Sequence, residues 1–131
     1  FAGFLEDRYT TLPATDDRIM ATNLEAEWRY GSTDLDFGVE RRCVKDVIVH
    51  AFAHHDESNS VQHTLWEMGR AVVDSCPSVD EIWFSLPNLH HIAVDLAPYG
   101  LRNEGEVFVV TDTPSGRIEG TVRWTEGAFP A

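Results

Sequence analysis

Apolar and polar residues alternate from Ile19 to Tyr30, which is typical of a strand with one face against a core and the other in water. The apolar positions are Met20, Leu24, Ala26, Trp28 and Tyr30, and the polar positions between them are Asn23, Glu25, Glu27 and Arg29. We therefore predict an antiparallel strand here. Gly31-Ser32-Thr33-Asp34 ends it, because glycine and small polar residues favour turns.

Two helices are predicted next, because apolar residues recur at the spacing of one helical face. These residues are Phe37, Val44, Ile48, Ala51 and Phe52 in the first helix, and Val61, Leu65, Met68 and Val72 in the second. Asp34 or Asp36 can cap the first helix, which ends in the polar loop 54–60. Ser60 can cap the second helix, and Cys76-Pro77-Ser78 stops it, since proline cannot continue a helix.

Three further strands are predicted after the helices, over Ile82 to Leu96, Glu106 to Thr111 and Arg117 to Trp124. The turn Thr113-Pro114-Ser115-Gly116 joins the last two. Helices and strands that are segregated along a chain favour an α+β fold, here an antiparallel sheet with two helices packed on one face. The other face would then be covered by something outside this chain, such as a second copy.

Two polar residues, Asn88 and His90, interrupt the apolar face of the predicted strand from Ile82 to Leu96. The apolar residues on that face are Ile82, Phe84, Leu86, Ile92, Val94 and Leu96. Burying a carboxamide and an imidazole is unfavourable unless each finds a partner. Two interpretations stay open: the pair bonds to neighbouring backbone, or it points into a pocket that holds a small polar ligand.

The 131 residues suffice for one domain with a core, and they carry a formal charge of −12. Nucleic acids and anionic membranes bind clustered Lys and Arg, so we expect neither as a partner. An anionic ligand would need a local positive site. Cys43 and Cys76 lack the CxxC spacing of metal and redox motifs, which favours buried thiols over a disulfide.

Two places can supply a local positive site. Arg18 either forms ion pairs with Asp16 and Asp17, or its planar guanidinium group forms two parallel hydrogen bonds to an anionic heterocycle. Val61-Gln62 opens the second predicted helix, whose first N–H groups lack internal partners and favour anionic oxygens. The Gln62 carboxamide can donate to one ring atom and accept from the next, or it can simply be solvated.

A metal site is disfavoured. His50 and His54 have the i, i+4 spacing of metal ligands, but no further carboxylate or Cys follows at a fitting position. The chain also has no sequence signature of a nucleophilic Ser–His–Asp or Cys–His arrangement.

Several motifs of the chain occur together in one family, in unbroken order from Phe1 to about Arg123. They are Phe1 with Gly3-Phe4 and Asp7, Tyr9-Thr10-Thr11-Leu12, Asp17-Arg18, Ser60-Val61-Gln62 with Thr64 and Met68, Ser85-Leu86-Pro87-Asn88-x-His90, Asp95-Leu96, Glu106-Val107-Phe108 and Gly116-x-Ile118-x-x-Thr121-Val122. The chain resembles the C-terminal half of urate oxidases (uricases), which oxidise urate to 5-hydroxyisourate. Ser-Leu-Pro-Asn-x-His is the most specific element.

The resemblance implies a tunnelling fold (T-fold), in which two tandem halves, each a four-stranded antiparallel sheet with two helices, close a barrel in a homotetramer. We expect residues 1–131 to be a single C-terminal T-fold domain that lacks its first strand and the N-terminal tandem half. The resemblance also implies no metal or organic cofactor, with dioxygen and water as co-substrates. A cytoplasmic location is expected for a bacterial enzyme, and a peroxisomal one for a eukaryotic enzyme.

By the same resemblance, Phe1 would stack on the urate ring. Arg18 and Gln62 would grip its two edges, and the Val61 N–H would donate to a ring oxygen.

Asn88 would hold dioxygen or water above the ring. His90 would belong to a proton relay with a Lys and a Thr from the first half of another subunit, which puts the active site at a subunit interface.

Two alternatives remain. One is a non-catalytic purine-binding or assembly module of the same fold. The other is a different purine- or pterin-binding enzyme of the tunnelling class, which would typically anchor the ring with a Glu, and no Glu is seen in the matching clamp.

Overall fold

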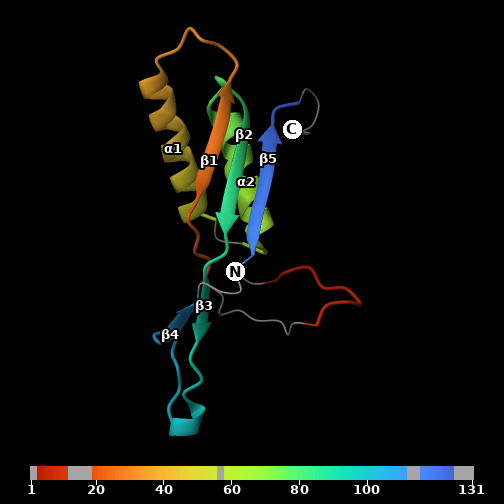
Figure 1. Ribbon diagram of the computed structural model, residues 1–131, viewed down its shortest axis with the longest axis vertical. Coiled ribbons are helices and arrows are strands. Elements are labelled where there is room, and N and C mark those ends of the chain that lie inside the picture. The colour runs from red at the N-terminus through yellow and green to blue at the C-terminus, as the bar shows by residue number, and fades with distance from the viewer. Residues whose placement is uncertain (1–2, 12–18, 56–57, 112–115, 126–131) are drawn as a thin grey trace.

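The structure is a computed structural model that describes residues 3–11, 19–55, 58–111 and 116–125. Its elements are β1 (Glu25–Tyr30), α1 (Phe37–Ala53), α2 (Val61–Ser75), β2 (Val79–Pro87), β3 (His90–Ala93), the 3-10 helix η1 (Ala97–Tyr99), β4 (Phe108–Thr111) and β5 (Arg117–Arg123). β1, β2 and β5 form an antiparallel sheet in the order β1-β2-β5. β3 and β4 form a separate hairpin that extends from one end of the body (Figure 1).

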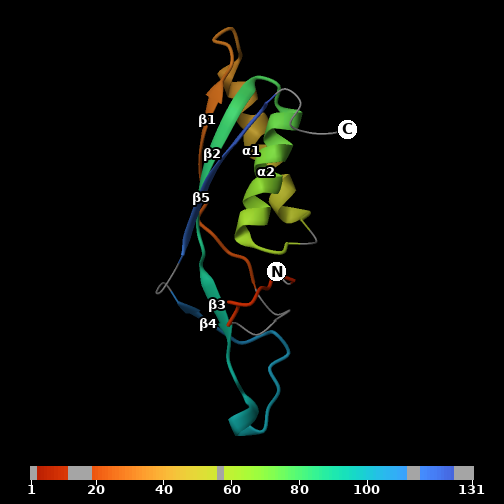
Figure 2. The ribbon, with the colours of Figure 1, turned by 90° about the vertical axis from the view of Figure 1, so that its right-hand side faces the viewer.

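Both helices lie on the same face of the sheet (Figure 2). α2 packs directly on β2 and β5, and α1 packs beside α2. The predicted α+β layer is therefore confirmed. No described element covers the opposite face of the sheet, where Glu27 and Thr121 are exposed (Figure 2). No helix in the described ranges is both long enough and apolar enough to cross a bilayer.

The core fills the space between the helices and the sheet. Its buried side chains include Val44, Ile48, Leu65, Met68, Val72, Ile82, Phe84, Leu86 and Val122. Burying each large apolar side chain contributes roughly 1.5–3 kcal/mol. The predicted apolar faces of both helices are confirmed, with one difference: Phe37 is 47% exposed, because it opens α1 and packs against Tyr30 at the edge of the core.

The helix boundaries follow from local capping chemistry. Of the two predicted caps of α1 it is Asp36 that acts, and its carboxylate accepts from the N–H groups of Gly38 and Val39. Ser60 caps α2 as predicted, and its hydroxyl accepts from the N–H of His63 at 3.1 Å.

The prediction of one strand from Ile82 to Leu96 is wrong. β2 ends at Pro87, which has no N–H for the hydrogen-bond ladder, and among the described strands β3 then pairs with β4 alone. Ile92 is 50% exposed, so the core face does not continue into the hairpin.

The predicted first strand and the predicted strand from Glu106 to Thr111 are shorter in the structure. β1 begins at Glu25, although Met20 and Leu24 still pack against the core. β4 begins at Phe108 and pairs with β3, whereas β5 pairs with β2. Residues 113–115 of the predicted turn lie outside the described residues.

Candidate active site

The end of β2 brings Asn88 between two neighbouring strands. The Asn88 N–H donates to the Gly116 carbonyl at 2.8 Å, and the Leu89 N–H donates to the Ala21 carbonyl at 3.0 Å. These two bonds hold the backbone after Pro87 from both sides, although regular pairing has ended. The Asn88 side chain is half-buried, which leaves it accessible to a small molecule.

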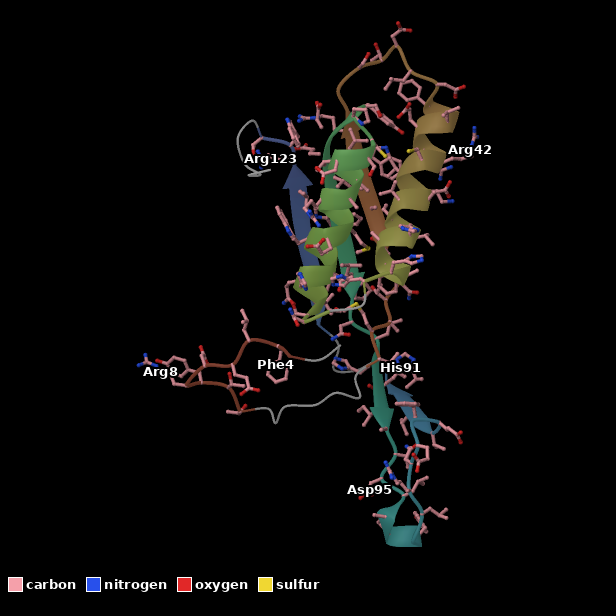
Figure 3. The ribbon with its side chains drawn as sticks, turned by 180° about the vertical axis from the view of Figure 1, so that it is seen from behind. Phe4, Arg8, Arg42, His91, Asp95 and Arg123 are labelled. Atoms are coloured by element: carbon pink, nitrogen blue, oxygen red, sulfur yellow. The ribbon has the colours of Figure 1, made fainter. Side chains whose placement is uncertain are left out.

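His90 begins β3, two residues after Asn88, and lies opposite Thr111 of β4. Its side chain is half-buried. The neighbouring His91 is also half-buried, and its Nδ1 lies 3.1 Å from the Leu89 carbonyl at the point where the sheet passes into the hairpin (Figure 3). The two adjacent histidines therefore differ: a ring nitrogen of His91 is engaged by the local backbone, and His90 has no such local contact among the described residues.

The N-terminus of α2 offers two backbone donors. The Ser60 hydroxyl accepts a hydrogen bond from the His63 N–H, and the Thr64 N–H donates to the Ser60 carbonyl at 3.1 Å. The N–H groups of Val61 and Gln62 find no acceptor within the described part of the chain. The first turn carries no acidic side chain, so no carboxylate within that turn offsets the positive end of the helix dipole.

A small hydroxyl network holds this turn in place. Thr64 is buried, and its hydroxyl bonds to the Ser60 carbonyl at 3.2 Å and to the Ser58 hydroxyl at 2.7 Å. The Val61 side chain is buried in the core, whereas Gln62 is exposed. The carboxamide of Gln62 is therefore available to a ligand that approaches the helix end.

Three segments meet at the same end of the body. Figures 1 and 2 both show the first turn of α2 beside the point where β2 ends. The N-terminal segment also reaches this region: Gly3 has a φ of 72°, and a Cβ added to it would lie 3.4 Å from the Asn59 side-chain oxygen. The fold thus brings Val61, Gln62, Asn88 and His90 to the end of the helix-and-sheet body where the β3–β4 hairpin begins. Phe1 and Arg18 lie outside the described residues.

A cavity of about 630 Å³ lies elsewhere, between α1 and α2, and its lining includes His50, His54 and His55. The rings of His50 and His54 stack at 4.1 Å, and the Nδ1 of His54 lies 2.9 Å from the His50 carbonyl. Among the described residues, no three His, Cys, Asp or Glu side chains are arranged to hold a metal ion.

The two cysteines are free thiols whose sulfur atoms lie 3.3 Å apart, between α1 and the end of α2. Burial raises the pKa of Cys76 to about 12, and the contact with Cys43 adds to this effect. Cys76 is therefore protonated at neutral pH. The sequence pattern alone did not predict that the two thiols meet.

Comparison with known proteins decides the family. The Uricase family model matches residues 1–119. The chain belongs to the uricase family. The uricase of Arthrobacter globiformis is 47% identical over 123 residues, which are 94% of this chain and 40% of that protein. The uricase of Danio rerio is 40% identical over 126 residues, which are 93% of this chain and 42% of that protein. The chain therefore spans about two fifths of the length of these relatives.

Solved structures agree with this assignment. The crystal structure of uricase from Arthrobacter globiformis superposes with a TM-score of 0.82 at 44% identity, covering 98% of this chain and 44% of that one. A urate oxidase structure from Bacillus sp. TB-90 gives a TM-score of 0.72 at 28% identity, covering 95% of this chain and 42% of that one. The predicted family and its tunnelling α+β fold are confirmed.

Proposed function

We propose that this chain is part of a urate oxidase, which converts urate, dioxygen and water to 5-hydroxyisourate and hydrogen peroxide. Relatives named uricase match nearly the whole chain, and the chain spans about two fifths of them. The activity is accordingly proposed for the longer protein, and this chain would supply its substrate clamp and one member of its proton relay.

The observation that carries this proposal is the open N-terminus of α2. The N–H groups of Val61 and Gln62 have no acceptor among the described residues, at the end of the body where Asn88 lies. Backbone donors at a helix N-terminus favour an anionic oxygen. Urate is a planar anion with ring oxygens and ring N–H groups, so the Val61 N–H would donate to a ring oxygen and the exposed Gln62 carboxamide would both donate and accept.

Arg18 and Phe1 complete the proposed clamp. A guanidinium fork can form two parallel hydrogen bonds to the opposite edge of the ring, and an aromatic ring can stack on its face. These roles come from motif positions in the sequence, because both residues lie outside the described ranges.

The chemistry suits a protein without an organic cofactor. Triplet dioxygen reacts slowly with closed-shell molecules, so the substrate itself must donate electrons, and urate that loses a further proton is such a donor. Preorganised positive groups at the clamp would stabilise the added charge. Asn88 would hold dioxygen or water above the ring.

His90 would move protons in this reaction, since an imidazole can donate and accept a proton near neutral pH. Its relay partners, a Lys and a Thr, would come from another subunit of a homotetramer. The uncovered face of the β1-β2-β5 sheet supports such an assembly, because an antiparallel sheet in a barrel needs a partner to close it. We propose a cytoplasmic location for a bacterial protein and a peroxisomal one for a eukaryotic protein.

The test is urate consumption by the full-length protein, followed as loss of the ultraviolet absorbance of urate after treatment with a chelator. Arg18→Ala should weaken urate binding at least tenfold, or about 1.4 kcal/mol. Arg42→Ala is the matched control, since Arg42 is exposed on α1 (Figure 3). His90→Ala should slow turnover with little change in urate affinity, and the adjacent His91→Ala should retain most of the rate.

Unchanged absorbance with the full-length protein would contradict the proposed activity, and urate binding without turnover would identify a purine-binding module instead. A wild-type rate in the His90→Ala variant would remove His90 from the relay.

A further inference from the structure

The strand pairing of β1 and β2 continues beyond the end of β1. Within the sheet, Glu25 lies opposite Ser85, and each step back along β1 matches one step forward along β2. The hydrogen bond from the Leu89 N–H to the Ala21 carbonyl keeps this register four residues further on. Thr22 therefore lies directly opposite Asn88.

Thr22 and Asn88 also share the face of the sheet that the helices cover. Side chains alternate between the two faces of a strand. Leu24 and Leu86, two residues from Thr22 and Asn88 respectively, both pack in the core on the helix side. Thr22 and Asn88 are consequently cross-strand neighbours on this face, which places the Thr22 hydroxyl within reach of the Asn88 carboxamide. Figure 2 shows that α2 begins beside this end of the sheet.

The Thr22 hydroxyl is buried and has no hydrogen-bond partner among the described residues. The hydroxyls of the buried residues Thr64 and Ser85 differ in this respect. Thr64 bonds to Ser58 and to the Ser60 backbone, and Ser85 donates to Glu119. A buried hydroxyl without a partner lowers the stability of the fold, and its presence calls for a specific reason.

We propose that Thr22 is the positioning residue of Asn88, an inference that rests on the proposed urate oxidase function. In the substrate complex the Thr22 hydroxyl donates to the Asn88 side-chain oxygen. That bond fixes which way the carboxamide faces, so its NH₂ group is free to donate to dioxygen or water above the urate ring. Hydrogen bonds of this kind are often unmade before the substrate binds.

The test uses the full-length oxidase and two substitutions. Thr22→Val keeps the shape of the side chain and removes the hydroxyl, and Thr22→Ser keeps the hydroxyl. Urate and dioxygen are varied separately in steady-state kinetics. Thr22→Val should lower kcat/KM for dioxygen about tenfold and change the KM for urate less than twofold. Thr22→Ser should recover most of that loss.

Two further measurements separate positioning from a merely structural role. In an Asn88→Ala background, Thr22→Val should have no additional effect on kcat/KM for dioxygen, because the hydroxyl would act only through the carboxamide. Anaerobic urate binding should match that of the wild type, which shows that the variant has folded with its clamp intact.

Three results would overturn this role for Thr22. They are wild-type oxygen kinetics in Thr22→Val, an undiminished effect of Thr22→Val in the Asn88→Ala background, and loss of urate binding together with turnover. Each leaves the proposed oxidase activity standing, because the wild-type protein still consumes urate. A wild-type protein that does not consume urate removes the proposed function, and this inference with it.

Discussion

Replacing Gly69 with alanine tests how closely α2 must approach the sheet. Gly69 is buried in the middle of α2, and a Cβ at this position would lie 2.7 Å from the Cβ of Val122 on β5. Carbon atoms in ordinary contact are about 3.5–4.0 Å apart. The helix and the strand would therefore have to separate by about 1 Å.

Two opposing effects set the expected stability change. Alanine is a better helix former than glycine by about 1 kcal/mol, and overpacking a core costs about 1–3 kcal/mol. The steric effect should win, with a net loss of about 1 kcal/mol and a melting temperature about 2 °C lower in the full-length protein. Because α2 carries Val61 and Gln62, its displacement should also reduce kcat/KM for urate, and shifts of this size can cost a hundredfold.

The matched control is Gly38→Ala in the first turn of α1. There an added Cβ would lie 3.2 Å from the capping oxygen of Asp36 and 3.7 Å from the Arg42 side chain, so the cap would need to shift by only a few tenths of an ångström. This variant should be at least as stable as the wild type and equally active, as measured by thermal unfolding and urate kinetics. A Gly69→Ala protein as stable and as active as the Gly38→Ala protein would refute the close-packing argument.

Two other predictions follow from the helix cap and from the buried thiol. Ser60→Ala should lower the stability of the fold by about 1 kcal/mol and weaken urate binding. Asp36→Ala should lower the stability by as much but leave urate binding intact, because Asp36 caps α1 at the far end of the body. Equal urate affinities of the two variants would contradict this. Burial raises the pKa of Cys76 from 9.0 to about 12, so the folded state holds a proton that the unfolded state loses. Urea unfolding should therefore show stability falling as pH rises above about 9. Cys76→Ala should flatten that fall, and an unchanged pH dependence would exclude Cys76 as its cause.

The elements set by local chemistry were predicted from the sequence. The apolar faces of α1 and α2 follow from helical spacing, and their first residues follow from the side chains of Asp36 and Ser60, which bond within three residues. The family resemblance also named Val61, Gln62, Asn88 and His90, which the fold brings to one end of the body. Their roles, like those of Phe1 and Arg18, stay predictions.

Long-range pairing could not be read from the same patterns. The apolar positions before Asn88 and after His90 keep the same period-two phase, so the pattern predicted one strand from Ile82 to Leu96. Which neighbour each backbone N–H bonds to is decided by residues far along the chain, here Ala21 and Gly116. The contact between the thiols of Cys43 and Cys76 has the same origin.

The sequence by itself determined the α+β class, both helices with the Ser60 cap of the second, and the family, because these depend on neighbouring residues and on motif order. Only the tertiary structure decided where β2 ends, that β4 pairs with β3, and that Thr22 lies opposite Asn88 with no partner for its hydroxyl among the described residues. The pairing partner of a strand and the burial of a polar atom depend on segments that are distant in sequence. The pattern of residues along one strand therefore cannot predict either of them.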